Sequence, residues 1–483
     1  MNRLSKSEQG VTRRSFFRAM TLAGVAGAGA VAASSVAAQV EAVGKAGEEA
    51  GTFREPARDL PVREDVDVIV CGAGPAGVAA AISAARSGAS TRLFDVNGCL
   101  GGIWTAGLLC WVLDYKTTGL ADEITRRLDE RDARRVQSSK RRYAYEPEEM
   151  KLLLENMCVE AGVKVRLHTG VRAAHRDGRR ISTIVTESKS GREAWRAKTF
   201  IDATGDGDLA AFSGCGFDMG HPDSGKCQPL TMYALVLVKD AQALKAYLTL
   251  EKTSADESQV YRSKNSKIMQ ELIRAGTPPS YKSPSIFYIR DNVVLFMFNH
   301  EYGVQANDAD AITAATMNAR REITAMADGL RKLGGVWENL RIIATAEQIG
   351  VREGRRIHGL YQVKLEDLTT GVRHADGIVR ARFGVDVHCL SLNKEDSHAE
   401  ITKGLRVKPY DIPLRALIAK DADNMLMAGR CISGDFFAHS SYRVTGNAVP
   451  MGEAAGQTAA LAALSGRLPS QVAFSELKLA LET

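Results

Sequence analysis

Residues 66–95, VDVIVCGAGPAGVAAAISAARSGASTRLFD, decide the fold of this chain. Residues 66–71 are β-branched and apolar, which is typical of a strand buried on both faces of a parallel sheet. A glycine-rich loop follows, and then a helix of small residues that continues to about Ser87. A second strand, residues 90–94, ends at Asp95, which stands 23 residues after Gly72. This order of strand, glycine loop, helix, strand and acid predicts a Rossmann-like fold that binds a dinucleotide.

Each glycine of the loop has its own structural role. Gly72 allows the tight turn, Gly74 lets the backbone approach a diphosphate, and Gly77 brings helix and strand close together. The first N–H groups of the helix point toward the phosphates, and Asp95 can accept hydrogen bonds from the adenosine ribose. The expected contacts are Gly72, Gly74, Pro75, Ala76, Gly77 and Asp95.

Two other glycine-rich stretches lack this context. Residues 24–29 have no strand before them, and residues 205–210 follow a strand but are not followed by a second strand that ends in an acid. We therefore expect no separate NAD(P)H-binding domain.

Composition and charge bound the remaining possibilities. At roughly 150 residues per domain, a chain of 483 residues is expected to form two or three lobes. Hydrophobic residues make up 45% and charged residues 25%, which excludes collagen, coiled-coil and multi-span membrane classes. Of the net charge of +6, residues 1–38 carry +4, from five basic side chains and one acid. The little that remains does not favour nucleic acid as a partner.

The N-terminal segment is expected to be an export signal. Arg13 and Arg14 lie in TRRSFFR, and an uncharged run rich in Ala, Gly and Val follows to about Val40. This pattern resembles a twin-arginine signal, which implies the twin-arginine export machinery as a partner and a periplasmic or extracellular location. An uncleaved anchor is the alternative, but Ala and Gly contribute little hydrophobicity. No later stretch reaches 18 consecutive apolar residues, so no membrane span is expected in the mature chain.

Several further motifs stand in order along the chain: residues 101–108 (GGIWTAGL), 201–208 (IDATGDGD), 352–357 (REGRRI), 386–388 (DVH), 428–433 (AGRCIS), 441–444 (SYRV) and 451–456 (MGEAAG). Together they resemble a family of FAD-dependent oxidoreductases related to the flavin module of heterodisulfide reductase. The resemblance extends over residues 65–465, nearly all of the mature chain.

This resemblance implies an α/β fold: a Rossmann-like FAD-binding domain of glutathione reductase type, assembled from discontinuous segments, plus a second α+β substrate lobe. It implies FAD as the cofactor, and a terminal helix from about Ala448 whose N-terminus faces the flavin, where the helix dipole would stabilise negative charge. The FAD contacts it implies, beyond the first loop, are Gly101, Gly102, Thr105, Thr204, Gly205, Asp206, Gly429, Arg430, Met451 and Gly452.

The cysteines argue against two related chemistries. Disulfide reductases of this fold carry a cysteine pair just after the Gly-Gly of the flavin loop, where this chain has residues 103–105 (IWT). The nearest cysteines, Cys99 and Cys110, flank the loop. None of the eight cysteines has the spacing of an iron–sulfur or zinc site, so no metal is expected. Disulfides are left open.

The rest of the chain divides into an expected order of segments. A helix over 147–161 precedes a meander over 163–168, 180–187 and 193–203, and residues 292–299 and 308–333 are expected to form a strand and a long helix. The expected division is a signal peptide over 1–38, a linker over 39–60, the first part of the FAD domain over 61–220, a substrate-facing lobe over 221–400, the second part of the FAD domain over 401–470, and a tail over 471–483.

Candidate catalytic residues follow from what flavin chemistry requires. His388 follows Asp386 by two residues, so both can lie on one face, and histidine suits proton transfer near neutral pH. Arg443 can hold a carboxylate, and His439 lies close before it. Relatives carry a Thr-His pair soon after the position of Ser433, but this chain does not, so the resemblance assigns His439 no role. Surface or structural roles for both histidines stay open.

The sequence therefore predicts an exported FAD-dependent oxidoreductase that transfers a hydride between a small organic substrate and flavin N5. The alternative is an electron-transfer flavoprotein subunit that serves a separate partner. A flavin monooxygenase would need NAD(P)H, which is scarce outside the cytosol. Neither the substrate nor the electron acceptor can be identified from the sequence.

Overall fold

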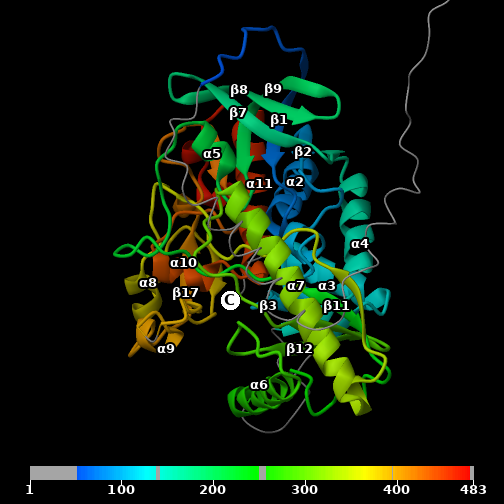
Figure 1. Cartoon of the computed structure of the whole chain (residues 1–483). Helices are drawn as coiled ribbons and strands as arrows, with labels where there is room; N and C mark the ends of the chain where they lie inside the picture. Colours follow the sequence, from blue (N-terminus) through cyan, green and yellow to red (C-terminus); the bar gives the residue numbers. More distant parts are fainter. Residues whose placement is uncertain (1–51, 137–141, 250–256, 394, 479–483) are drawn as a thin grey trace, which may run out of the picture. The chain divides into compact units, whose positions relative to one another are not determined.

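A computed structural model describes residues 52–136, 142–249, 257–393 and 395–478 (Figure 1). The described residues from Leu60 onward form one compact unit. The expected twin-arginine signal and most of the linker lie outside the described residues. Among the described residues, no helix combines the length and the apolar character needed to cross a membrane.

The main sheet has seven strands and is built around residues 66–95. Its order is β6-β2-β1-β9-β8-β7, with β18 paired to β9. The strands are β1 (Val62–Cys71), β2 (Thr91–Phe94), β6 (Lys164–Arg166), β7 (Gly170–Asp177), β8 (Arg180–Ser188), β9 (Gly191–Asp202) and β18 (Met425–Met427). β1 is parallel to both β2 and β9, while β7, β8 and β9 are antiparallel. Residues 68–71 are fully buried, as the apolar run predicts.

The meander differs from the expectation in its first strand. Residues 164–166 form β6, which pairs in parallel with β2 at the far edge of the sheet. Its place in the meander is taken by β7, which pairs with β8. β7 buries only Gly170 and Val171, and its other residues are half-buried or exposed without alternation, so its pairing could not be recognised from the sequence.

Two helices from opposite ends of the described chain pack side by side against this sheet. α2 (Pro75–Arg86) and α11 (Thr445–Ser465) approach closely because glycines replace side chains at the crossing (Figure 1). A Cβ added to Gly452 would lie 2.1 Å from the Ala76 carbonyl oxygen, and one added to Gly456 would lie 2.2 Å from that of Ala80. α11 begins at Thr445, one turn before the expected start. The chain's last long helix is thereby fixed against its first.

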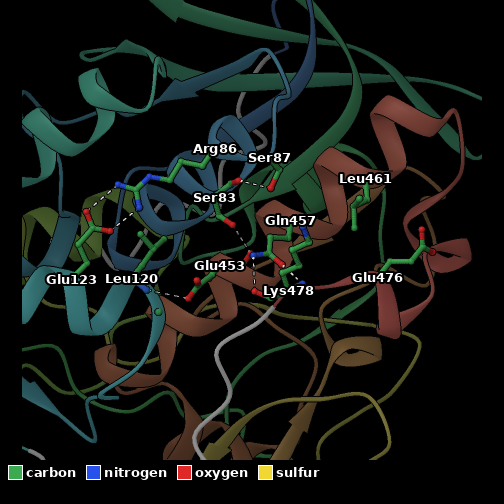
Figure 2. Close-up of a pocket in the computed structure, with 11 residues that line it drawn as sticks. Ser83, Arg86, Ser87, Leu120, Glu123, Glu453, Gln457, Leu461, Glu476 and Lys478 are labelled. Atoms are coloured by element: carbon green, nitrogen blue, oxygen red, sulfur yellow. Dashed lines mark hydrogen bonds and ion pairs between the residues drawn. The ribbon is translucent and has the colours of Figure 1, made fainter.

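A cavity lies beside this helix pair, and Figure 2 shows its lining. It measures about 660 Å³, and its polar groups bond largely to one another. Ser83 Oγ donates to the Glu453 carbonyl oxygen at 3.0 Å, and the Glu453 carboxylate accepts from the Leu120 N–H at 3.3 Å. Arg86 pairs with Glu123 at 2.6 Å. These bonds join α2 and α11 to α3 (Gly119–Glu130), so the region serves packing between helices.

The second lobe is an antiparallel sheet, β12-β13-β11-β14, covered by the long helix α7. Its elements are β11 (Ala234–Leu237), β12 (Ser285–Arg290), β13 (Val293–Met297), β14 (Arg341–Thr345), α6 (Glu257–Arg274) and α7 (Ala309–Leu333). Asp308 caps α7 by accepting from the Ala311 N–H at 2.9 Å, close to the predicted start. Buried residues of both sheets, such as Val70 and Phe296, belong to one apolar cluster.

Smaller elements connect the two sheets. The strands are β3 (Trp111–Leu113), β4 (Arg134–Val136), β5 (Arg142–Tyr145), β10 (Phe217–Asp218), β15 (Arg356–Ile357), β16 (Gly377–Ala381) and β17 (Tyr410–Pro413). The helices are α4 (Pro147–Glu160), α5 (Asp208–Phe212), α8 (Leu365–Thr370), α9 (His398–Ile401) and α10 (Phe436–Tyr442), with 3-10 turns at Gly102–Trp104, Gly335–Trp337, Leu414–Ala416, Pro469–Gln471 and Phe474–Glu476. The expected lobe boundaries remain a proposal within this unit.

Candidate functional site

A cavity of about 780 Å³ begins at the glycine loop after β1 and extends to the second lobe. Gly72, Gly74 and Asp95 line one part of it, and Tyr233, Tyr281 and His388 line another. Its size lies within the range of cofactor and ligand sites, about 300–1,000 Å³. Because parallel strands end at this edge of the sheet, it is where an open α/β sheet binds its ligand.

The glycine loop has the shape that the sequence predicts. Gly72 has a φ of +95°, and an added Cβ would lie 2.4 Å from the Ala203 carbonyl oxygen. At Gly77 a Cβ would lie 1.8 Å from the Gly72 carbonyl oxygen. Gly74 is different, because a Cβ there would meet no described atom within 4 Å. Gly72 and Gly77 are thus needed for the turn itself, whereas the space over Gly74 is open.

Asp95 lies at the end of β2 and supports this loop. One carboxylate oxygen accepts from the Ala73 N–H at 2.5 Å, and the other accepts from the Asn97 N–H at 2.7 Å. Burial raises the pKa of Asp95. A carboxylate has about four acceptor positions, so a ribose hydroxyl can still be bound. Asp95 therefore has a structural task besides the ligand contact that the sequence predicts.

The Gly-Gly loop is held against the first loop. The Gly101 N–H donates to the Ala73 carbonyl oxygen at 2.7 Å, and Gly101 has a φ of +103°. Gly102 lines the cavity, but Thr105 is buried and its hydroxyl donates to the Leu100 carbonyl oxygen at 2.5 Å. From β5, Tyr145 Oη bonds to the carbonyl oxygen of Trp104 within the loop and to that of Leu109 just after it, at 2.9 Å each.

The third segment of the cavity wall follows β9. Asp202, fully buried, accepts hydrogen bonds from Thr204 and from the Ala210 N–H, and burial raises its pKa to about 6. Arg430 Nη2 donates to Asp206 at 2.8 Å, so Asp206 is engaged within the protein. Arg430 Nη1 is buried and has no partner among the described residues. An orphaned guanidinium N–H in this cavity wall suits an anionic or oxygen-rich cofactor.

At the other end of the cavity, His388 and Arg443 are brought together. His388 Nε2 lies 3.3 Å from Asp386 Oδ2, and Arg443 Nη2 donates to the Asp386 carbonyl oxygen at 2.8 Å. Gln228, fully buried, accepts from the His388 N–H at 3.0 Å and from Arg443 at 3.2 Å. Arg352 lines the same end. Sequence reasoning missed Gln228, because no motif marks a single glutamine in a loop.

The ionisation of this group favours a neutral imidazole. Burial, together with the nearby Arg352, lowers the pKa of His388 to about 4, although Asp386 opposes that shift. Desolvation would raise the pKa of Asp386, but His388 and Arg443 outweigh it and hold that pKa well below its usual value. With Asp386 accepting at Nε2, Nδ1 of His388 keeps a lone pair at neutral pH. Such a group can take up a proton.

His439 is placed differently. Its side chain is fully buried, both ring nitrogens lack partners among the described residues, and it does not line the cavity. Burial, with Arg356 nearby, lowers its pKa well below the usual value. The geometry therefore gives it no contact with a ligand.

The predicted residues divide by whether they line the cavity. Those that do are Gly72, Gly74, Pro75, Ala76, Asp95, Gly102, Thr204, Gly205, Gly429, Arg430, His388 and Arg443. Those that do not are Gly77, Gly101, Thr105, Asp206, Met451, Gly452 and His439. Lining residues that sequence reasoning missed include Trp111, Tyr233, Tyr281, Phe287 and Phe383. Lying far apart in sequence, they share no motif that could have indicated them.

All eight cysteines are free thiols, and seven are buried. Burial raises the pKa of Cys158 and Cys227 to about 12 each, so neither is a ready nucleophile. Cys99, next to the Gly-Gly loop, also has a raised pKa because of burial. Among the described residues, no three His, Cys, Asp or Glu side chains gather as metal ligands.

Comparison with known proteins agrees with this geometry. The family described as FAD dependent oxidoreductase matches residues 67–481. Over 109 residues the chain is 32% identical to the thiamine thiazole synthase of Pyrococcus abyssi; the match covers 22% of this chain and 41% of that protein. The chain thus spans less than half the length of this relative.

Solved structures resemble the chain at low identity. The p-nitrophenol 4-monooxygenase PnpA of Pseudomonas putida is 9% identical with a TM-score of 0.47, covering 84% of this chain and 82% of that one. A geranylgeranyl bacteriochlorophyll reductase-like protein of Thermoplasma acidophilum is 12% identical with a TM-score of 0.43, covering 83% and 79%. These likenesses carry no argument about substrate.

FAD fits the cavity on two observations: the open space over Gly74 and the unpartnered Arg430 N–H. The loops after β1, β2 and β9 would hold the cofactor, as in other dinucleotide folds. A family match over nearly all of the described chain, on an α/β Rossmann-type fold, agrees with that cavity. The chain therefore belongs to the FAD-dependent oxidoreductase family, with FAD as its cofactor.

Proposed function

We propose that this enzyme oxidises or reduces a small organic substrate by transferring a hydride between it and flavin N5. The observation that carries the proposal is one cavity that joins the glycine loops to a polar end containing His388, Asp386 and Arg443. When bound, FAD supplies hydride acceptance or donation at N5. The protein's part is to bind the substrate, exclude water and move the accompanying proton.

His388 is the proposed proton-transfer residue. Asp386 fixes the imidazole through Nε2, which leaves Nδ1 free to take a proton from a substrate hydroxyl or amine. Gln228 holds the backbone of His388 and the guanidinium of Arg443 in one frame. This division makes His388 a candidate catalytic residue and Gln228 a positioning residue.

An electron-transfer protein would need an accessible flavin edge more than an internal polar end. The cavity end with its histidine, carboxylate and arginine favours an enzyme with its own substrate site. The electron-transfer alternative is therefore not favoured.

The test is anaerobic reduction of the bound flavin. The purified yellow protein is mixed with acids, alcohols, amines and sugars, and absorbance near the flavin maximum is followed. A substrate that bleaches wild type but not His388→Gln, while FAD content is equal, supports the proposal. Bleaching that is equally fast in His388→Gln would remove His388 from the reaction.

Export by the twin-arginine route is part of the proposal and is supported by residues 12–18 (TRRSFFR). Kinship with the flavin module of heterodisulfide reductase is supported by the order of the motifs from Gly101 onward. Export is tested by fractionating cells that express the full chain or the variant with Arg13→Lys and Arg14→Lys. Retention of the variant and export of the wild type is the expected outcome, and equal distribution contradicts it.

A further inference from the structure

The polar end of the FAD cavity contains two arginines that lack a full complement of anions. Arg352 follows β14, and Arg443 ends α10. Both are almost completely buried and line the cavity. Resting on the function proposed above, we infer that the substrate is an organic carboxylate whose anionic group is held by Arg352 and Arg443.

The first support is what Arg352 is bonded to. Its Nη1 donates to the Pro229 carbonyl oxygen at 2.8 Å and to Thr231 Oγ1 at 2.7 Å, both neutral acceptors. Within the described part of the chain, no carboxylate oxygen lies within 4 Å of this guanidinium. A buried cation without an anion is costly, because water can no longer solvate the charge.

The second support is the state of Arg443. Its nearest carboxylate oxygen, in Asp386, is 3.8 Å away, and its Nε is buried without a partner among the described residues. Burial lowers its pKa to about 10, so it remains charged at neutral pH. A charged guanidinium with an unpartnered N–H can donate a charge-assisted hydrogen bond to a carboxylate.

The net charge at this end of the cavity favours a ligand that carries one negative charge. His388 is neutral at pH 7 because its pKa is about 4, and burial likewise lowers the pKa of His300, which lies 5.0 Å from it between ring centroids. The other carboxylate that acts on Arg443, Glu353, is paired with Arg356. Arg352 and Arg443 therefore face Asp386 with one positive charge in excess. One carboxylate removes that excess.

The cofactor's diphosphate is the other anion that these arginines could bind. Arg430 belongs to the part of the cavity expected to hold FAD, because its guanidinium lies beside Gly205 and donates to Asp206. Arg352 and Arg443 instead bond to residues of other segments, at Pro229 and Asp386. Because their bonding partners differ from those of Arg430, we assign them to the substrate and not to the phosphates.

The walls of this end describe the rest of the substrate. Trp111, Tyr233, Tyr281 and Phe287 line it, and the rings of Tyr281 and His388 lie 5.8 Å apart between centroids. Aromatic faces suit an apolar or unsaturated body beside the anionic group. The expected class is thus a monocarboxylate with a carbon skeleton of several atoms, and a phosphate ester is the competing possibility that the test decides.

The experiment uses the FAD-loaded protein and a matched pair of probes, benzoate and its neutral analogue benzamide, with phenylphosphate as the third. Binding is followed by the change in the flavin absorption spectrum, and FAD content is measured separately after denaturation. The variants are Arg352→Gln and Arg443→Gln. Arg126→Gln, which removes an exposed pair with Glu130, is the control.

Wild type and Arg126→Gln are expected to bind benzoate at least tenfold more tightly than benzamide or phenylphosphate. Either cavity variant should lose about tenfold or more of the benzoate affinity while keeping its FAD, as expected for one charge-assisted hydrogen bond. Arg443→Lys should restore part of the loss, because it restores the charge.

Three results would overturn the inference while leaving the proposed function intact. They are equal binding of benzoate and benzamide, tighter binding of phenylphosphate, and benzoate affinity unchanged in both cavity variants. Loss of FAD from both Gln variants would assign the arginines to the cofactor and also overturn it. A wild-type protein that binds no FAD would instead defeat the proposed function itself.

Discussion

Replacing Gly74 by alanine separates cofactor binding from folding. Gly74 has a φ of −65° and a ψ of −177°, which alanine adopts freely, and an added Cβ meets no described atom within 4 Å. The methyl group would nevertheless occupy the space that the diphosphate needs. Gly452→Ala is the matched opposite, because its Cβ would lie 2.1 Å from the Ala76 carbonyl oxygen in the α2–α11 contact.

The magnitudes follow from these distances. For Gly74→Ala the free energy of unfolding of the FAD-free protein should change by no more than about 0.5 kcal/mol. The same methyl should weaken FAD binding by about 1–3 kcal/mol, or roughly 5- to 150-fold in Kd. For Gly452→Ala the free energy of unfolding should fall by about 1–3 kcal/mol or more, because two helices must separate.

The assay has two parts, urea unfolding of the FAD-free proteins and FAD titration followed by quenching of flavin fluorescence. Wild-type affinity for FAD in Gly74→Ala would refute the placement of the diphosphate over this residue. A loss of stability in Gly74→Ala as large as in Gly452→Ala would show that the space over Gly74 is not open.

Three further predictions concern the polar end and the Gly-Gly loop. Asp386→Asn removes the carboxylate that raises the pKa of His388, so the acid limb of kcat/KM, expected near pH 4, should move to lower pH; an unmoved limb in a pH–rate profile would contradict this. His388 has a lower pKa folded, about 4, than unfolded, 6.5, so the unfolded state binds the extra proton in that window and stability is lost as pH falls through it. His388→Gln should therefore remove about 3 kcal/mol of the stability difference between pH 7 and pH 4, measured by urea unfolding, and an unchanged difference would argue against a buried neutral histidine. Tyr145→Phe leaves the carbonyl oxygens of Trp104 and Leu109 without their shared donor. The free energy of unfolding, measured by thermal unfolding, should fall by about 1–3 kcal/mol, and an unchanged value would contradict the role of this hydroxyl.

The part of the fold that follows from the sequence is the part fixed by local rules. The strand, loop and helix from Val66 to Arg86 form as predicted. The turn depends on the positive φ of Gly72 and the strand on its own apolar residues, and both can be read from a short stretch of sequence. The long helix α7 was predictable for the same reason, since Asp308 caps it and an apolar stripe continues along it. Strand pairing is not local: residues 164–166 were wrongly placed in the meander, and β7 was not predicted.

The candidate site shows the same limit. Motifs indicated the loops, but they did not distinguish Gly74, which opens onto the cavity, from Gly452, which serves the contact between α2 and α11. Tyr233 and Tyr281 reach the cavity from separate segments, and Gln228 gains its role from the fold alone. Residues of this kind depend on three-dimensional proximity, which no spacing in the sequence records.

We propose that one cavity holds FAD along the glycine loops and presents a substrate site at His388 and Arg443. The decisive measurement is a crystal structure of the FAD-bound protein soaked with benzoate. We expect the diphosphate over Gly74 and the carboxylate between Arg352 and Arg443. A diphosphate bound by those two arginines, or a flavin ring far from His388, would contradict it.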